Sequence, residues 1–185
     1  MPTSPPSHRQ EKPRKSGLDR SIVLIGLMGV GKSTIGRRLA ERLKLPFVDS
    51  DEEIQKAAGM SVGRLFETYG ETHFRDGERR VIARLIDEKI KIIATGGGAF
   101  VDDETRKLIL EKATAIWLDA DLEVLAERVS RRNTRPLLRG KDPKTVLSEL
   151  ATQRNPLYSQ AQLRIQSDAG AHEETVDRIL KALAE

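Results

Sequence analysis

The segment GLMGVGKS, from Gly26 to Ser33, follows the apolar run Ile22–Ile25 and leads into a stretch with helical periodicity. It matches in full the pattern G-x-x-x-x-G-K-[ST] of phosphate-binding loops, in the strand-to-helix setting that this pattern requires. Glycines let the backbone wrap around a phosphate with its N–H groups pointing inward, and the following helix adds the positive end of its dipole. We therefore expect residues Gly29–Thr34 to form a phosphate cradle.

This loop predicts binding of ATP together with Mg²⁺. Lys32 would reach the β- and γ-phosphates, and the Ser33 hydroxyl would be a ligand of the metal that bridges them. The alternative is a glycine-rich turn that enters a helix with an exposed lysine. The motif does not identify the phosphate acceptor, because GTPases, motor ATPases and small kinases share it. The predicted ATP contacts of the loop are Gly29, Val30, Gly31, Lys32, Ser33 and Thr34.

The rest of the chain alternates short apolar runs with longer helical patterns, which is typical of a parallel sheet with helices on both faces. We predict an α/β fold of three layers around a five-stranded parallel sheet. The stretch Asn133–Pro143, punctuated by Pro and Gly, is predicted to be a mobile loop. The predicted strands are Ser21–Ile25, Pro46–Ser50, Lys91–Thr95, Ala115–Asp119 and Gln162–Gln166. The predicted helices are Lys32–Lys44, Asp51–Ala58, Val62–Tyr69, Glu71–Lys89, Asp103–Lys112, Leu122–Arg132, Lys144–Arg154 and His172–Ala184.

Composition indicates one globular domain. The chain has 185 residues, of which 38% are hydrophobic and 32% charged, a balance too polar for a membrane span. It has no cysteine, which excludes disulfides and thiolate zinc sites and fits a cytoplasmic location. We expect no membrane partner.

The net charge of +4 is concentrated at the amino terminus. Residues 1–20 carry five Lys or Arg against two acidic residues and are rich in Pro and Ser, so they predict a disordered basic extension. Residues 21–185, the expected folded domain, are then nearly neutral. This distribution argues against a nucleic-acid partner, which would require a basic folded surface.

Asp49 and Asp51 follow the second predicted strand. Two residues apart at a strand end, they would face the same side at the carboxyl edge of the sheet, where open α/β sheets bind ligands. One carboxylate could serve Mg²⁺ and the other a hydroxyl of the acceptor. The competing interpretation is that Asp51 caps the next helix.

Two further features are compatible with a ligand site beyond the phosphate loop. Arg75 and Glu78 are three residues apart on a predicted helix, so the glutamate can hold the guanidinium as an oriented fork for a carboxylate; a surface ion pair is the ordinary explanation of this spacing. Gly96-Gly97-Gly98 follows the third predicted strand, where bare backbone can approach a ligand closely. The alternative for the glycines is a flexible turn.

Together these motifs resemble shikimate kinase. The resemblance rests on five segments in order along the chain, and it covers nearly everything from Ser21 to the carboxyl terminus. It implies a P-loop kinase fold similar to nucleoside monophosphate kinases, with a mobile lid, and transfer of phosphate from ATP to the 3-hydroxyl of shikimate; we expect a monomer. The segments are Asp49-Ser50-Asp51, Phe74-Arg75 with Glu78, Gly96-Gly97-Gly98, Arg135-Pro136-Leu137-Leu138 and Arg154-Asn155-Pro156-Leu157-Tyr158.

The resemblance also implies residue roles. On the acceptor side, Asp51 binds the attacking hydroxyl, Gly97 contacts shikimate, and Arg154 clamps the carboxylate together with Arg75. On the ATP side, Arg135 contacts the phosphates from the lid, Arg128 flanks the adenine, and Asp49 assists the metal. Lys32, Asp51 and Arg135 are the residues with predicted catalytic roles. No role is predicted for His8, His73 or His172, which lack metal-ligand or catalytic spacing.

Two other functions compete with this prediction. Another P-loop metabolite kinase, such as a gluconate kinase, would share the ATP side without needing Arg75 and Arg154 in this arrangement. A nucleotide-gated nucleic-acid binder would explain the basic amino terminus, but it requires salt-dependent binding and a basic surface with aromatic residues.

Overall fold

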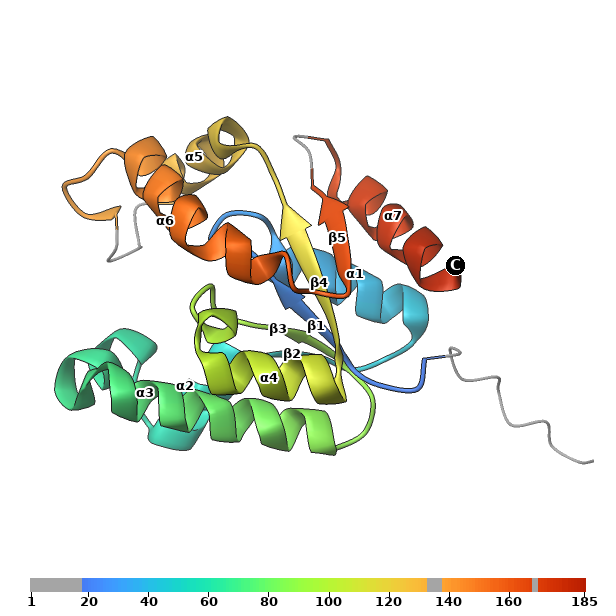
Figure 1. The fold of residues 1–185 in the computed structure, drawn as a ribbon, viewed down its shortest axis with the longest axis horizontal. Helices are drawn as coiled ribbons and strands as arrows, with labels where there is room; N and C mark the ends of the chain where they lie inside the picture. Colours follow the sequence, from blue (N-terminus) through green and yellow to red (C-terminus); the bar gives the residue numbers. More distant parts are fainter. Residues whose placement is uncertain (1–17, 133–137, 168–169) are drawn as a thin grey trace, which may run out of the picture.

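Five parallel strands form one sheet in the computed structural model, which describes residues 18–132, 138–167 and 170–185 (Figure 1). The sheet order is β2-β3-β1-β4-β5, and all neighbouring pairs are parallel. Each predicted strand is present and differs from its prediction by at most one residue at either end. The strands are β1 (Ile22–Ile25), β2 (Phe47–Asp49), β3 (Ile92–Ala94), β4 (Thr114–Asp119) and β5 (Leu163–Gln166).

The central strands are apolar along their whole length. All four residues of β1 and all three residues of β3 are at most 1% exposed. A parallel strand with helices on both faces has no solvent side, so its sequence reads as a continuous apolar run rather than an alternation. This burial makes β1 and β3 the rigid support of the loops that follow them.

Helices cover both faces of the sheet (Figure 1). On one face, α1 (Lys32–Leu43) lies against α7 (His172–Ala184); on the other, α3 (Val62–Asp87) lies against α4 (Asp103–Lys112). The prediction of a three-layer α/β fold is therefore confirmed. The remaining helices are α2 (Ser50–Ala58), which packs on α3, α5 (Leu122–Ser130) and α6 (Pro143–Tyr158), which pack on each other, and the short 3-10 helix η1 (Ala99–Val101).

The helix α3 contains both helices that were predicted on either side of Gly70. Gly70 has φ 80° and ψ 174°, so the backbone leaves the helical conformation at this one residue and resumes it afterwards. A positive φ of this size is readily adopted by glycine and disfavoured for other residues. The predicted break between Tyr69 and Glu71 is thus present as a kink rather than as a loop.

The helix α6 continues past its predicted end. The prediction ended it at Arg154, two residues before Pro156, which cannot donate the backbone hydrogen bond of a helix interior. The structure shows instead that the helix includes Pro156 and ends at Tyr158. Tyr158 is 0% exposed and its ring packs on Phe100 and Trp117. Burial of this large side chain offsets the missing hydrogen bond.

Two predicted segments fall partly outside the described residues. The amino-terminal extension 1–20 is described only from residue 18, and the predicted loop Asn133–Pro143 lacks residues 133–137. Within the described part of that loop, Pro143 is already the first residue of α6, and Asp142 caps this helix by accepting from the Thr145 N–H. The carboxyl boundary of the predicted loop is therefore one residue too late. Residues 168–169 also lie outside the described residues.

The chain leaves β1 and β3 in opposite directions. After β1 it enters α1 on one face of the sheet and returns to β2; after β3 it passes through η1 to α4 on the other face and returns to β4 (Figure 1). Loops that diverge at the carboxyl ends of adjacent parallel strands leave a crevice between them, which is the usual ligand site of open α/β sheets. The phosphate loop and the Gly96–Gly98 run lie at this edge.

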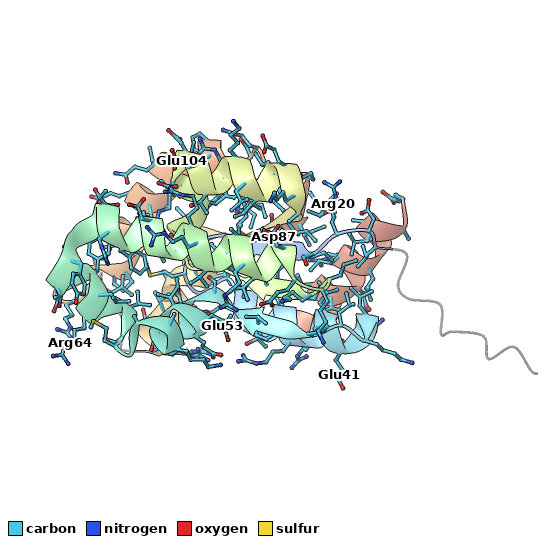
Figure 2. The ribbon with its side chains drawn as sticks, turned by 90° about the horizontal axis from the view of Figure 1, so that it is seen from below. Arg20, Glu41, Glu53, Arg64, Asp87 and Glu104 are labelled. Atoms are coloured by element: carbon cyan, nitrogen blue, oxygen red, sulfur yellow. The ribbon has the colours of Figure 1, made fainter. Side chains whose placement is uncertain are left out.

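Charged side chains populate the outer surface. Figure 2 shows Glu41 of α1, Arg64 of α3 and Glu104 of α4 pointing away from the body of the protein, and all three are exposed. Within the ranges that the structure describes, no helix combines the length and the apolar character needed to cross a membrane.

The close contact between α1 and β2 can be tested at Gly36. A Cβ added at Gly36 would lie 2.5 Å from Phe47 Cε2 and 3.2 Å from Leu24 Cδ1. We expect Gly36→Ala to lower the free energy of unfolding by about 1–3 kcal/mol, because overpacking exceeds the gain of about 1 kcal/mol in helix propensity. Gly77→Ala in α3 is the matched control, since nothing lies within 4 Å of its added Cβ; it should be neutral or stabilising. Urea unfolding measures both changes, and equal stability of the two variants would contradict this packing.

Candidate active site

Among the α-helices of the described ranges, α1 alone has neither a side-chain hydrogen bond at its N-cap nor an acidic residue in its first turn. Asp or Ser side chains cap α2, α3, α4 and α6, and glutamates lie in the first turns of α5 and α7. The first N–H groups of a helix and its dipole attract an anion. The amino terminus of α1 is thus suited to an anion that comes from outside the chain.

The phosphate loop is held against the sheet by close backbone packing. Gly26 has φ 146°, and an added Cβ there would lie 2.5 Å from the Leu118 carbonyl oxygen of β4. Gly31, the N-cap of α1, has φ 98°. The Lys32 ammonium donates to the carbonyl oxygens of Gly26 (2.7 Å) and Leu27 (3.2 Å). These contacts hold the Lys32 ammonium over the phosphate loop that precedes α1.

A side-chain hydrogen bond between Ser33 and Asp49 connects the loop to β2. Ser33 Oγ donates to Asp49 Oδ2 over 2.8 Å. The other oxygen of the carboxylate, Oδ1, accepts from the backbone N–H groups of Asp51 (2.9 Å) and Glu52 (3.4 Å). One carboxylate therefore caps α2 and also orients the hydroxyl that was predicted to bind the metal.

This geometry corrects two points about the acidic pair. The N-cap of α2 is Asp49, so the alternative in which Asp51 caps this helix is wrong. The strand β2 ends at Asp49, and Ser50 already belongs to α2. The period-two argument for a shared face therefore does not apply, although both carboxylates do line the same cavity.

A cavity of about 490 Å³ opens between the phosphate loop and the carboxyl ends of β2 and β3. It brings the predicted ATP residues of the loop together with Asp51 and Gly97. Val30, a predicted ATP contact, does not line it, and its side chain is 1% exposed. The lining residues are Met28, Gly29, Gly31, Lys32, Ser33, Thr34, Asp49, Asp51, Thr95, Gly96, Gly97, Arg128, Arg131, Arg132 and His172.

The environment of Asp51 disfavours its ionised form. Burial, followed by the negative charge of Asp49, raises the pKa of Asp51, while Lys32 and Arg75 act in the opposite direction. A carboxylate with a raised pKa is closer to the operating pH and accepts a proton more readily than an exposed one. Asp51 is therefore the acidic residue of this cavity whose chemistry best fits an interaction with a hydroxyl proton.

The three glycines after β3 lie directly under three predicted site residues. A Cβ at Gly96 would lie 3.0 Å from Asp51 Oδ1, and one at Gly97 would lie 2.8 Å from Arg154 Nη1. At Gly98 it would collide with the Arg75 guanidinium. Close packing at all three positions argues against the alternative of a merely flexible turn.

The Arg75–Glu78 pair is buried and tightly held. Arg75 Nη1 donates to Glu78 Oε1 over 2.6 Å, and Glu78 is only 1% exposed. Burial raises the pKa of Glu78 to about 7, despite the opposing effect of Arg75. The simple surface ion pair that this spacing also allowed is therefore wrong, because a surface pair would not be desolvated in this way.

A second cavity, of about 410 Å³, contains both predicted carboxylate-binding arginines. Arg75 comes from α3 and Arg154 from α6, and Gly98 lies in the wall between them. Since Gly97 lines the first cavity and touches Arg154, the glycine run forms a common border of the two cavities. The structure thus places two cations on one side of the glycines and the phosphate loop on the other.

Arg128 and His172 lie beside the phosphate loop. Arg128 Nη1 donates to the carbonyl oxygens of Gly29 and Val30, each at 3.3 Å. The His172 ring packs on Gly31, and burial, followed by the charge of Arg128, lowers its pKa. No sequence motif marks His172; the signal that could have found it is its place at the start of α7, after a strand whose carboxyl end lies at the same sheet edge. Arg135, by contrast, lies outside the described residues.

The chain is similar to known proteins over most of its length. Residues 28–184 match the family model "Shikimate kinase". A shikimate kinase of Caulobacter vibrioides is 58% identical over 164 residues, which cover 89% of this chain and 82% of that protein. The structure of shikimate kinase from Acinetobacter baumannii in complex with shikimate superimposes with a TM-score of 0.84 at 36% identity and covers 89% of this chain and 93% of that one. A gluconokinase from Sinorhizobium meliloti, at 22% identity and a TM-score of 0.61 with coverage of 89% and 91%, shares the fold.

The pKa of Glu78 predicts a pH dependence of stability. Because the folded-state pKa lies above the ordinary value of 4.5, at about 7, the stabilising effect of the bound proton is complete below about pH 4.5 and is lost as the pH rises through 7. In the wild type, the free energy of unfolding should therefore fall by on the order of 1 kcal/mol or more between about pH 4.5 and pH 7, and Glu78→Gln should abolish this fall.

Urea unfolding of the wild type and the variant between pH 4.5 and pH 8 measures the two slopes. Glu123→Gln on α5 is a control, because Glu123 is an exposed partner of Lys144. This substitution should not change the slope of unfolding free energy against pH. Identical slopes for Glu78→Gln and wild type would contradict a buried, protonated Glu78.

Proposed function

The chain belongs to the shikimate kinase family, and we propose that it transfers the γ-phosphoryl group of ATP to the 3-hydroxyl of shikimate, giving ADP and 3-phosphoshikimate, a step of aromatic amino acid biosynthesis through chorismate. The observation that carries the proposal is the glycine run, which separates a phosphate-loop cavity from a cavity with two arginines. An acceptor with both a carboxylate and a hydroxyl can span these two cavities.

On the ATP side, the backbone from Gly29 to Thr34 and the amino terminus of α1 cradle the phosphates, and Lys32 neutralises the β- and γ-phosphates. The residues near Ser33 fit Mg²⁺, since a hydroxyl and the Asp49 carboxylate are hard oxygen donors. No group of three or more acidic, His or Cys side chains suited to a metal occurs in the described part of the chain. The ion would therefore be held largely by the phosphates, with Ser33 as a direct ligand and Asp49 acting through water. When bound, Mg²⁺ neutralises charge on the transferred group.

On the acceptor side, shikimate offers one carboxylate and three hydroxyls on a small ring. Arg75, oriented by Glu78, and Arg154 bind the carboxylate through planar, bidentate hydrogen bonds that lysine cannot form. Asp51 accepts a hydrogen bond from the 3-hydroxyl, and the bare backbone at Gly97 lets the ring approach the sheet edge.

The reaction is an in-line transfer in which positioning contributes most of the rate. Because phosphoryl transfer has a loose transition state, a strong base is not required, and Asp51 orients the hydroxyl and takes up its proton as transfer proceeds. The raised pKa of Asp51 supports this role. Arg135 stabilises the charge of the moving group from a lid over residues 133–142, and Arg128 flanks the adenine; these two roles rest on the family resemblance.

The domain division, the cytoplasmic location and the monomeric state remain predictions. We propose that residues 21–185 are the catalytic domain and that residues 1–20 lie outside it. The near-neutral charge of this domain supports small-molecule partners over a nucleic acid. A gluconate kinase activity has the fold in its favour, and gluconate also carries a carboxylate; the family match and the relatives at 58% identity favour shikimate as the acceptor.

Coupled ADP-release assays with shikimate, gluconate and no acceptor test the proposal directly. Release that depends on shikimate supports it, and release that depends on gluconate alone would overturn it. A nucleic-acid-stimulated ATPase without any acceptor dependence would favour the remaining alternative.

The role of Arg75 predicts a selective loss on substitution. Arg75→Lys keeps the charge but loses the planar fork, so the KM for shikimate should rise by about tenfold or more while the KM for ATP changes little. Arg84→Lys is the matched control, because Arg84 lies on the same helix and pairs with Glu53 and Glu88 on the surface. Steady-state kinetics with each substrate varied measures the split. An unchanged KM for shikimate would remove Arg75 from the acceptor site.

The proposed role of Arg135 predicts an effect on kcat, in contrast to the effect of Arg75→Lys on KM. If its contact with the transferred group strengthens in the transition state, Arg135→Ala should lower kcat by about 10²-fold, with a smaller change in ATP affinity. Arg139→Ala, an exposed arginine four residues away, should retain kcat. A near-normal kcat for Arg135→Ala would contradict the assignment.

A further inference from the structure

Tyr158 is a buried polar side chain that the proposed reaction does not use. Its hydroxyl donates to the carbonyl oxygen of Gly97 over 2.6 Å, and the residue is 0% exposed. Its ring packs on Phe100 and Trp117, with centroids 6.4 Å and 6.0 Å away. In this apolar surrounding the hydroxyl needs a partner, and its partner is the middle residue of the glycine run.

Tyr158 and Arg154 act on the same glycine from the same helix. They are four residues apart on α6, so both side chains project from one face. A Cβ at Gly97 would lie 2.8 Å from Arg154 Nη1 and 3.8 Å from the Tyr158 hydroxyl. The Arg154 guanidinium is also close enough to the hydroxyl to act on its pKa, which burial raises. The hydroxyl thus stays protonated, as a hydrogen-bond donor, at neutral pH.

The hydrogen bond fixes two things at once. It sets the separation between α6, which carries Arg154, and the glycine run. It also fixes the rotation of the peptide between Gly97 and Gly98, because a trans peptide whose carbonyl points at Tyr158 must direct its N–H the opposite way. Without this bond a glycine peptide has many accessible orientations.

We propose that Tyr158 is a positioning residue for the acceptor: its hydrogen bond to Gly97 holds Arg154 and the Gly97–Gly98 peptide at the spacing that binds the carboxylate-bearing substrate. This inference rests on the proposed function. It explains why α6 runs through Pro156 and ends at Tyr158 rather than at Arg154, since the last turn brings the hydroxyl to Gly97. Tyr158 itself does not touch the reacting atoms.

Tyr158→Phe in the full chain is the test, because it removes one oxygen and keeps the packed ring. The KM for shikimate should rise by about fivefold or more, as expected for loss of a buried hydrogen bond that orients the site, while the KM for ATP stays within about twofold of wild type. Tyr69→Phe is the matched control: the only other tyrosine of the chain is 52% exposed and lines neither cavity, and both KM values should be unchanged.

A purely structural hydroxyl would give a different result. Tyr158→Phe would then melt at a lower temperature but, assayed well below that temperature, would keep the wild-type KM for shikimate, and this outcome overturns the proposal. Arg154→Lys combined with Tyr158→Phe adds a second measurement, since the two effects on shikimate KM should be less than additive if both act through Gly97; strictly additive effects would also count against it. A wild type without shikimate-dependent ADP release would instead refute the proposed function, so the two failures are distinguishable.

Discussion

Three charged side chains of the site pack directly against the backbone of the glycine run after β3. Asp51, Arg75 and Arg154 come from three different helices and meet at Gly96, Gly97 and Gly98, where any Cβ would displace them. Their mutual arrangement therefore depends on the absence of three methyl-sized groups. Because interiors are packed to near crystal density, a shift of one of these side chains would be transmitted to the others through the same short segment.

On the phosphate side, too, one short group positions several functional residues. The Asp49 carboxylate caps α2 with one oxygen and receives the Ser33 hydroxyl with the other. The start of α2, which carries Asp51, and the start of α1, which carries the phosphate loop, are therefore tied to one side chain. The amino terminus of α1 has neither a side-chain cap nor an acidic residue in its first turn, so its dipole is available to an external anion. Side-chain caps or first-turn acidic residues thus occur at every other described α-helix, and α1 is the one whose amino terminus is left to a ligand.

Local patterns in the sequence predicted the strands well, because a strand that is buried on both faces has an uninterrupted apolar sequence. Ile22–Ile25 is the clearest example. They also predicted the phosphate loop, whose motif is contiguous, and the Arg75–Glu78 spacing. The features that they missed depend on partners distant in the chain. Tyr158 extends α6 because its ring packs on Phe100 and Trp117. His172 lines the cavity because β5, the strand before it, ends at the same edge of the sheet. The alternative in which Asp51 caps α2 was wrong: the predicted helix began one residue too late, at Asp51, and the structure shows that Asp49 occupies the N-cap position.

The electrostatics of the acceptor side follow from one cause. Burial raises the pKa of both Glu78 and Asp51, which means that this region penalises isolated negative charge. A low effective dielectric also strengthens the attraction between a cation and an anion that does enter. Arg75 and Arg154 therefore compensate a bound carboxylate more strongly than water-exposed arginines could, whereas a neutral hydroxylated ring would bring no negative charge to them. Desolvation thus makes the site selective for an acceptor that carries its own negative charge.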